Sequence, residues 1–172
     1  FRSVEYPKHH SCFSCHHQGM GVVALALARA NGYTVPTKSI EEAAKHTEAD
    51  LKRDIALYQK GEGQPGGVSR AGYALLTLQF AKVAPDTVTT AVAGYLLQHG
   101  KAKGYWHSPA NRPPSEVSAF TDTFLAIRAL KAYTDANQKG EATARTEQAR
   151  LWLIKTPTKD TEDRVFQLWG LK

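Results

Sequence analysis

The strongest constraint on the fold is an alternation of two kinds of helical segment along the chain. Apolar segments rich in alanine and leucine, which suit burial on most sides, alternate with amphipathic segments that keep one polar face. Loops containing glycine and proline separate them, and the chain offers no strands. The sequence therefore predicts an all-α protein.

The alternation predicts about seven helices, of which the first, third, fifth and seventh are inner, buried helices. We expect Ser39 to be the N-cap of the second helix and Asp86 the N-cap of the fourth. The seven segments are residues 18–33, 37–61, 68–83, 86–100, 115–134, 141–156 and 161–172.

These segments also resemble one another at regular spacings. The string "ALLTL" at 74–78 matches "AIRAL" at 126–130 with an offset of 52, and "DTFLAIRALK" at 122–131 matches "DRVFQLWGLK" at 163–172 with an offset of 41. A repeat of this length holds one inner and one outer helix, so it predicts antiparallel helix pairs set side by side. The alternative is that helices rich in alanine and leucine look alike without being repeats.

The length of 172 residues suits one domain, with a reactive segment at 1–16 and helical repeats at 17–172. No apolar run is long enough to span a bilayer. The formal charge of +6 suits an acidic partner surface, but the basic residues are scattered, so nucleic acid is not an expected partner. Because the chain begins with Phe1, we expect a mature form after signal removal or an excised fragment.

Reactive side chains are concentrated in "HHSCFSCHHQ", residues 9–18, which holds both cysteines and four of the seven histidines. Cys12, Cys15 and His16 fit C-x-x-C-H, the attachment pattern of haem c. On a helical turn these positions share a face, so both thiols reach the haem vinyl groups while the histidine reaches the iron. We therefore predict one covalently attached haem c with His16 as its proximal iron ligand.

Three other interpretations of the cysteines stay open at this point. A zinc site would combine both thiols with two of the histidines His9, His10, His16 and His17, although structural zinc usually takes its second ligand pair from a distant segment. A redox dithiol usually precedes a helix in an α/β fold, and this chain offers no strands. The third interpretation is an accidental pairing of two buried thiols.

The loop at 100–116 is expected to cover the other face of the haem. Every segment that precedes an inner helix should lie at one end of the fold, so "GYWHSP" would meet the cysteine segment there. The expected contacts from this string are Tyr105 and Trp106, with His107 as the sixth iron ligand. Arg70 and Arg112, in loops at the same end, would pair with the haem propionates.

Other residues compete with His107. His99 ends the helix that leads into the loop and is the second choice. Met20 follows His16 by four residues on the same helix, so it approaches the same side of the haem and is expected to pack instead. His46, in the first half of an outer helix, is expected to be a solvated residue nearer the opposite end. An iron without a sixth ligand would bind peroxide or a small gas.

Two strings carry a family resemblance. The "GYW" loop, a proline-containing connection and a helix of the type "TxxxLxAL" are similar to repeats of the squalene cyclase and prenyltransferase superfamily, over roughly residues 17–172. The string "CFSCHHQGMGVVALALARANGY" at 12–33 resembles the start of haem-bearing relatives of that fold. The resemblance implies a partial α/α toroid with an open edge and with the haem motif at the start of its first inner helix.

The resemblance also implies a function. It points to a mono-haem c-type cytochrome in the periplasm or another extracytoplasmic compartment, serving as a subunit or domain of a larger redox assembly. Redox proteins, among them a membrane-associated electron-transfer complex, would be its partners. Terpene cyclisation is not expected because the family's D-x-D-D acid motif is missing from the sequence. The alternatives are a haem enzyme or sensor with an open distal site, and an interaction scaffold with structural haem or zinc.

Overall fold

The structure is a computed structural model that describes residues 9, 12–109 and 118–172. These residues contain eight α-helices and one π-helical turn. No strand occurs in these residues, so the prediction of an all-α protein is confirmed. The elements are η1 (Cys15–Gly19), α2 (Met20–Ala30), α3 (Thr37–Arg53), α4 (Ile55–Gln59), α5 (Gly67–Phe80), α6 (Thr87–Gln98), α7 (Ala119–Tyr133), α8 (Lys139–Lys155) and α9 (Thr161–Leu171).

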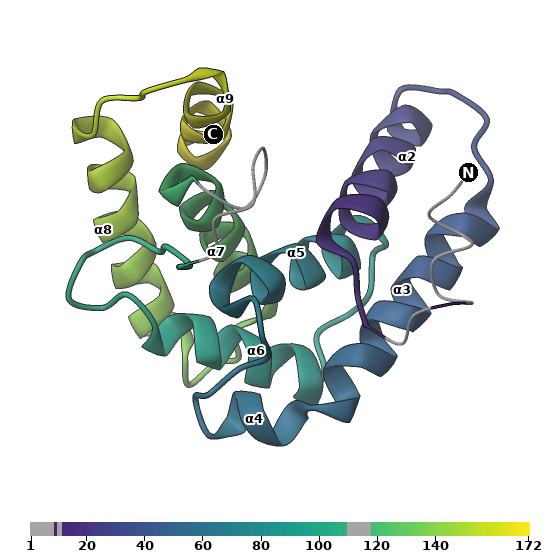
Figure 1. The fold of residues 1–172 in the computed structure, drawn as a ribbon, viewed down its shortest axis with the longest axis horizontal. Helices are drawn as coiled ribbons and strands as arrows, with labels where there is room; N and C mark the ends of the chain where they lie inside the picture. The colour runs from purple at the N-terminus through teal and green to yellow at the C-terminus, as the bar shows by residue number, and fades with distance from the viewer. Residues whose placement is uncertain (1–8, 10–11, 110–117) are drawn as a thin grey trace.

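The helices form two curved layers (Figure 1). In the inner layer α5 lies between α2 and α7, and α7 packs in turn against α9. In the outer layer α6 contacts α3, α4 and α8. Figure 1 shows α2 and α9 at the two ends of the resulting arc. None of the helices in the described ranges is long and apolar enough to cross a membrane, as predicted.

The single helix expected over 37–61 is two helices, α3 and α4, so the predicted count of seven was wrong. Asp54 interrupts the helix with φ −114° and ψ 22°. Aspartate favours such breaks because its side chain competes for hydrogen bonds. Here its Oδ2 accepts a bond from Gln64 Nε2 at 2.6 Å, which draws the following loop back toward α3. The break directs α4 along α6.

The two predicted N-caps have different outcomes. Asp86 caps α6 as expected: its Oδ1 accepts the Thr89 N–H at 2.8 Å, and Thr89 Oγ1 accepts the Asp86 N–H at 2.8 Å, a reciprocal capping box. The assignment of Ser39 was wrong, because α3 begins at Thr37 and its N-cap is Pro36, three residues before Ser39. The Ser39 N–H already donates to the Pro36 carbonyl within the first turn.

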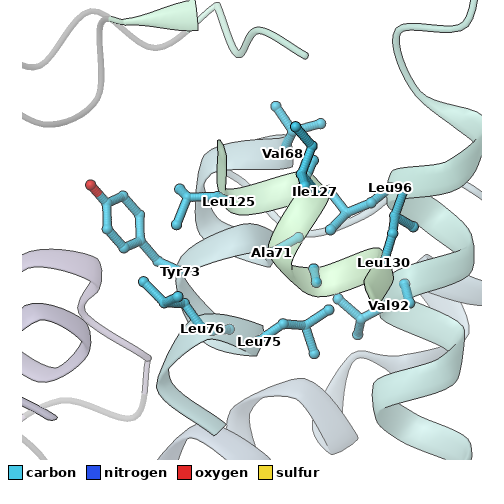
Figure 2. Packing of buried hydrophobic residues seen from close by; sticks show 14 of the residues in the cluster. Val68, Ala71, Tyr73, Leu75, Leu76, Val92, Leu96, Leu125, Ile127 and Leu130 are labelled. Carbon is cyan, nitrogen blue, oxygen red and sulfur yellow. The ribbon is translucent and has the colours of Figure 1, made fainter. Parts of the chain in front are cut away.

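A single large core lies between the layers and is centred on α5 and α7. Ten of the fourteen residues of α5 are buried, which is possible because helices contact it from both layers. Figure 2 shows side chains of α5, α6 and α7 converging, among them Leu75, Val92 and Ile127. The cysteine segment joins this core at its α2 side.

One contact between inner helices recurs at the spacing of the sequence repeat. A Cβ added to Gly72 of α5 would lie 2.6 Å from Leu125 Cβ of α7, so the two helices approach closely there. The offset of 52 relates Gly72 to Phe124, and the offset of 41 relates Leu125 to Phe166. These two phenylalanine rings join α7 to α9 with their centroids 5.4 Å apart. The sequence repeat thus coincides with a repeated packing contact.

Candidate functional site

The cysteine segment enters the first inner helix through a π-helical turn. Cys15 begins η1 and is buried, while Cys12, just before it, is half-buried. The N–H groups of Gln18 and Gly19 both donate to the Ser14 carbonyl oxygen, at 3.0 and 3.4 Å. Such turns insert an extra residue into a helix and are frequent at functional sites. The unusual helical geometry therefore occurs in the same segment as the cysteine motif.

A small residue lets this turn lie directly on α5. A Cβ added to Gly19 would be 3.2 Å from Thr77 Oγ1 and 3.6 Å from Tyr73 Cδ1. Figure 2 shows the Tyr73 ring pointing away from the labelled contacts between α5 and α6. Close packing of this kind restricts the positions available to the turn, and so to the cysteine that begins it.

Gln18 connects the cysteine segment to α3. Its side chain is fully buried, with Oε1 2.9 Å from the Ser14 nitrogen and Nε2 2.9 Å from His46 Nδ1. The expectation that His46 is a solvated residue near the opposite end was wrong. After a short turn α3 runs back along α2 and past its start, so the middle of α3 lies beside the cysteine segment.

Arg70, predicted as a site residue, lies in the first turn of α5 and is held by Asp50 of α3. Its Nη2 donates to both carboxylate oxygens, at 2.7 and 3.0 Å, and Arg53 pairs with the same carboxylate. Asp50 is only 1% exposed. Two guanidinium groups thus balance one buried negative charge.

Arg70 interacts electrostatically with Cys15. Burial lowers the pKa of Arg70, but its hydrogen bond to Asp50 and its electrostatic interactions with Asp50, Tyr58 and Cys15 leave that pKa above its ordinary value. The thiol therefore lies within Coulombic range of the guanidinium. Arg70 Nε is buried without a hydrogen-bond partner in the described part of the chain. An anionic group placed near Arg70 would meet a cation that Asp50 holds in place and that has an unused donor.

A buried polar network that the sequence did not reveal supports this arginine. Tyr58 Oη donates to Gln64 Oε1 at 2.8 Å, and Gln64 Nε2 donates to the Asp50 carbonyl oxygen at 3.2 Å. Burial raises the pKa of Tyr58 well above its ordinary value, so the phenol stays neutral and acts as a donor. The only local signal was the polar residue Gln64 inside a loop of glycine and proline.

The predicted contact residues Tyr105 and Trp106 are engaged with the outer layer. Trp106 is fully buried, its Nε1 donates to the Leu96 carbonyl oxygen at 2.7 Å, and the Arg145 guanidinium lies 4.4 Å from its ring centroid. Tyr105 stacks on Trp152 with ring centroids 4.4 Å apart. These contacts tie the loop to α6 and α8, and none of them involves the cysteine segment.

His107 follows Trp106 on the same loop and lies near the first turn of α7. Its Nδ1 is 3.9 Å from Oδ2 of the buried Asp122. Asp122 also accepts hydrogen bonds from Ser69 Oγ and from the Ser108 N–H, both at 2.6 Å. The Asp122 carboxylate therefore links the loop of His107 to the first turn of α5. Arg70 lies in the same turn, directly after Ser69.

The carboxylates of the last helix have a structural role. Asp163, related to Asp122 by the offset of 41, accepts a bond from Ser118 Oγ at 2.6 Å, and Asp160 caps α9. Burial raises the pKa of Glu162, which accepts a bond from Thr121 Oγ1. The string "DTED" at 160–163 therefore serves as the N-cap and first turn of α9.

Met20 packs as expected, and the other candidates have different surroundings or are not described. Met20 is half-buried and packs against the main core, and His99 Nδ1 lies 3.2 Å from the carbonyl oxygen of Tyr95. Arg112 lies outside the described residues, as do the side chains of His16 and His17. Among the side chains that are described, no three or more His, Cys, Asp or Glu residues are grouped to hold a metal ion.

Comparisons of the chain with protein-family models, with curated proteins and with solved structures found no match. The fold and the site define an all-α protein of two helical layers. Two thiols three positions apart precede its first inner helix, and the next inner helix begins with an arginine held by a buried carboxylate.

Proposed function

We propose that the chain binds one haem c covalently and transfers electrons. The observation that carries this proposal is the order Cys12, Cys15 and His16 at a helical start. Both cysteines would hold the group in thioether bonds, and His16 would ligate the iron. When bound, haem supplies reversible one-electron chemistry at its iron.

Arg70 supports this proposal because it fits the acidic part of a haem. Placing a propionate beside a protein core is costly unless a cation accompanies it. Asp50 holds the guanidinium in place, Nε is an unused donor among the described residues, and Cys15 interacts electrostatically with the guanidinium. Arg70 is therefore our candidate partner for one propionate, and Arg112 keeps the same assignment from its sequence position.

His107 is our candidate for the sixth iron ligand. Its Nδ1 faces Asp122, so Nε2 is the ring nitrogen turned away from the carboxylate, an arrangement common in ligating histidines. Its side chain is 40% exposed and therefore accessible to a ligand. Tyr105 and Trp106 would contribute by anchoring the loop, because their rings already contact Trp152 and Arg145.

The arrangement of helices supports a partial α/α toroid. The next inner helix packs on Gly72 in α5 and on Phe124 in α7. Val165 is the residue of α9 at the corresponding position of the repeat, yet its side chain is 41% exposed. Leu168 beside it is 67% exposed. We place the protein in the periplasm or another extracytoplasmic compartment, with redox proteins that present acidic surfaces to its net charge of +6.

The test is production of the chain with a secretion signal and the apparatus that attaches haem c. We expect one covalent haem per chain by mass spectrometry and a c-type pyridine haemochrome spectrum. Cys12→Ser and Cys15→Ser should each remove one thioether bond, and His16→Ala should change the iron spectrum. His17→Ala is the matched control in the same segment and should leave that spectrum unchanged.

The outcomes separate the candidate functions. Low-spin, six-coordinate iron in both oxidation states supports an electron carrier, and a change of spin state in His107→Ala supports that residue as ligand. High-spin iron that binds peroxide or carbon monoxide would favour the enzyme or sensor. A wild-type chain without covalent haem, whether or not it holds zinc, would contradict the proposal.

A further inference from the structure

We propose that His46 is a positioning residue for the cysteine segment: acting through Gln18, it fixes the backbone that presents Cys12 and Cys15. Which cofactor the thiols are presented to rests on the proposed function. The fixing of the backbone belongs to the chain itself and is tested separately below.

The polarity of the two hydrogen bonds follows from their chemistry. The Ser14 N–H only donates, so the Gln18 atom facing it at 2.9 Å is the carbonyl oxygen. The amide nitrogen of Gln18 then faces His46 and only donates, so His46 Nδ1 accepts at 2.9 Å. An accepting Nδ1 carries no proton. His46 is therefore a neutral imidazole with its proton on Nε2.

Burial makes this connection costly to lose. The Gln18 side chain has no exposed surface, so water does not readily replace a lost partner. Without His46, the amide nitrogen would lose its acceptor inside the protein, and Gln18 would have to move to find another. Its movement would also release the bond to the Ser14 N–H.

The place of Ser14 makes the connection relevant to the thiols. Ser14 lies between the cysteines and is the N-cap of η1, but its side chain makes no capping hydrogen bond. Gln18 reaches back from inside the turn to bond the N-cap N–H, as the third residue of a capping box does. His46 anchors this substitute cap to α3. A path of two hydrogen bonds thus runs from α3 to the peptide that joins Phe13 to Ser14, between the two cysteines.

The first experiment uses the full-length, reduced chain produced without haem attachment. Iodoacetamide alkylation of Cys12 and Cys15 is followed by peptide mass spectrometry. We expect His46→Ala to raise the alkylation rate of Cys15 about fivefold, the effect of one lost hydrogen bond on local opening. His46→Asn, which keeps an acceptor near the Nδ1 position, should restore most of the wild-type rate.

His99→Ala is the matched control. His99 is half-buried, and its Nδ1 lies near the Tyr95 carbonyl oxygen of its own helix. This variant should leave the Cys15 rate unchanged. Equal Cys15 rates in His46→Ala and His99→Ala would overturn the proposal, whatever cofactor the protein holds.

Amide hydrogen exchange separates positioning from general stability. In His46→Ala we expect faster exchange at Ser14 and unchanged exchange in the middle of α5. Equal acceleration in both places would mean that His46 only stabilises the fold, and would overturn the positioning role.

The second arm produces the same variants with the haem attachment apparatus and measures the fraction of chains that carry haem. We expect a lower fraction in His46→Ala than in wild type and His46→Asn. A wild-type chain without haem would contradict the proposed function while the alkylation and exchange results still decide the role of His46. Equal loading of wild type and His46→Ala would show that the fixed backbone is not needed for attachment.

Discussion

Asp50 and Tyr58 show how much of the site depends on single buried polar groups. Asp50 pairs with Arg70 and Arg53, and Tyr58 donates to Gln64, which in turn bonds the Asp50 backbone. Asp50, Tyr58 and Gln64 are almost completely removed from water, so solvent does not readily replace a partner that they lose. Even a substitution that changes few atoms at these residues should therefore lower the free energy of unfolding substantially.

Asp50→Asn keeps the shape of the side chain and removes its charge. Arg70 would lose its counter-charge in a mostly buried position, so we expect the free energy of unfolding to fall by about 3 kcal/mol. Urea unfolding followed by circular dichroism measures the change. Glu41→Gln, at an exposed position of the same helix, is the control and should have little effect. Equal unfolding midpoints for the two variants would contradict the role given to Asp50.

Tyr58 should make the protein sensitive to alkali. Burial raises its pKa above the ordinary value near 10, so the unfolded tyrosine loses its proton first as the pH rises. The folded state then binds more protons than the unfolded state, and stability falls with pH above about 10.

Tyr58→Phe removes this titration and should flatten the fall in stability above about pH 10, although the lost bond to Gln64 lowers stability at neutral pH. Urea unfolding measures both effects at a series of pH values. The series begins at about pH 8 and ends about two pH units above the ordinary tyrosine pKa. Tyr33→Phe, at a position 70% exposed, is the control. The same pH dependence in Tyr58→Phe as in wild type would rule out this origin.

At the scale of the elements, close approach of helices decides which positions accept a side chain. Gly72 of α5 faces Leu125 of α7, whereas a Cβ at Gly140 of α8 would meet no atom within 4 Å. Alanine favours a helix over glycine by up to about 1 kcal/mol. The two glycines therefore test whether local preference or packing dominates.

Gly72→Ala should destabilise the protein by about 2 kcal/mol, because the added Cβ would lie 2.6 Å from Leu125 Cβ and the resulting overpacking exceeds the gain in helix preference. Gly140→Ala should be neutral or slightly stabilising. Thermal unfolding by calorimetry compares the two variants. A rise in the unfolding temperature of Gly72→Ala would show that α5 and α7 do not approach this closely.

At the scale of the whole molecule, the two ends of the arc differ in how much apolar surface they expose. On α9, Val165, Leu168 and Trp169 are all partly or largely exposed, whereas Leu27 is the large exposed apolar residue of α2. A patch of this kind favours contact with another apolar surface. The end of the arc at α9 is thus the expected site of further association.

The double variant Val165→Ser and Leu168→Gln should reduce the fluorescence of a bound apolar dye and any self-association seen by light scattering. Its unfolding free energy should stay within about 0.5 kcal/mol of wild type, because neither side chain is buried. Leu27→Gln is the control, because Leu27 belongs to α2, which lies at the other end of the arc (Figure 1), and it should change dye binding less. An equal effect of both variants would mean that the exposed surface of α9 has no special role.

The sequence by itself determined the helical class, the capping of α6 by Asp86 and the cysteine motif, because each depends on residues close together in the chain. Only the tertiary structure decided which distant residues surround that motif. The bond between Gln18 and His46 joins positions 28 apart, and the pair of Asp50 and Arg70 joins positions 20 apart. Both depend on how far α3 runs past the start of α2, and helical periodicity carries no information on that placement.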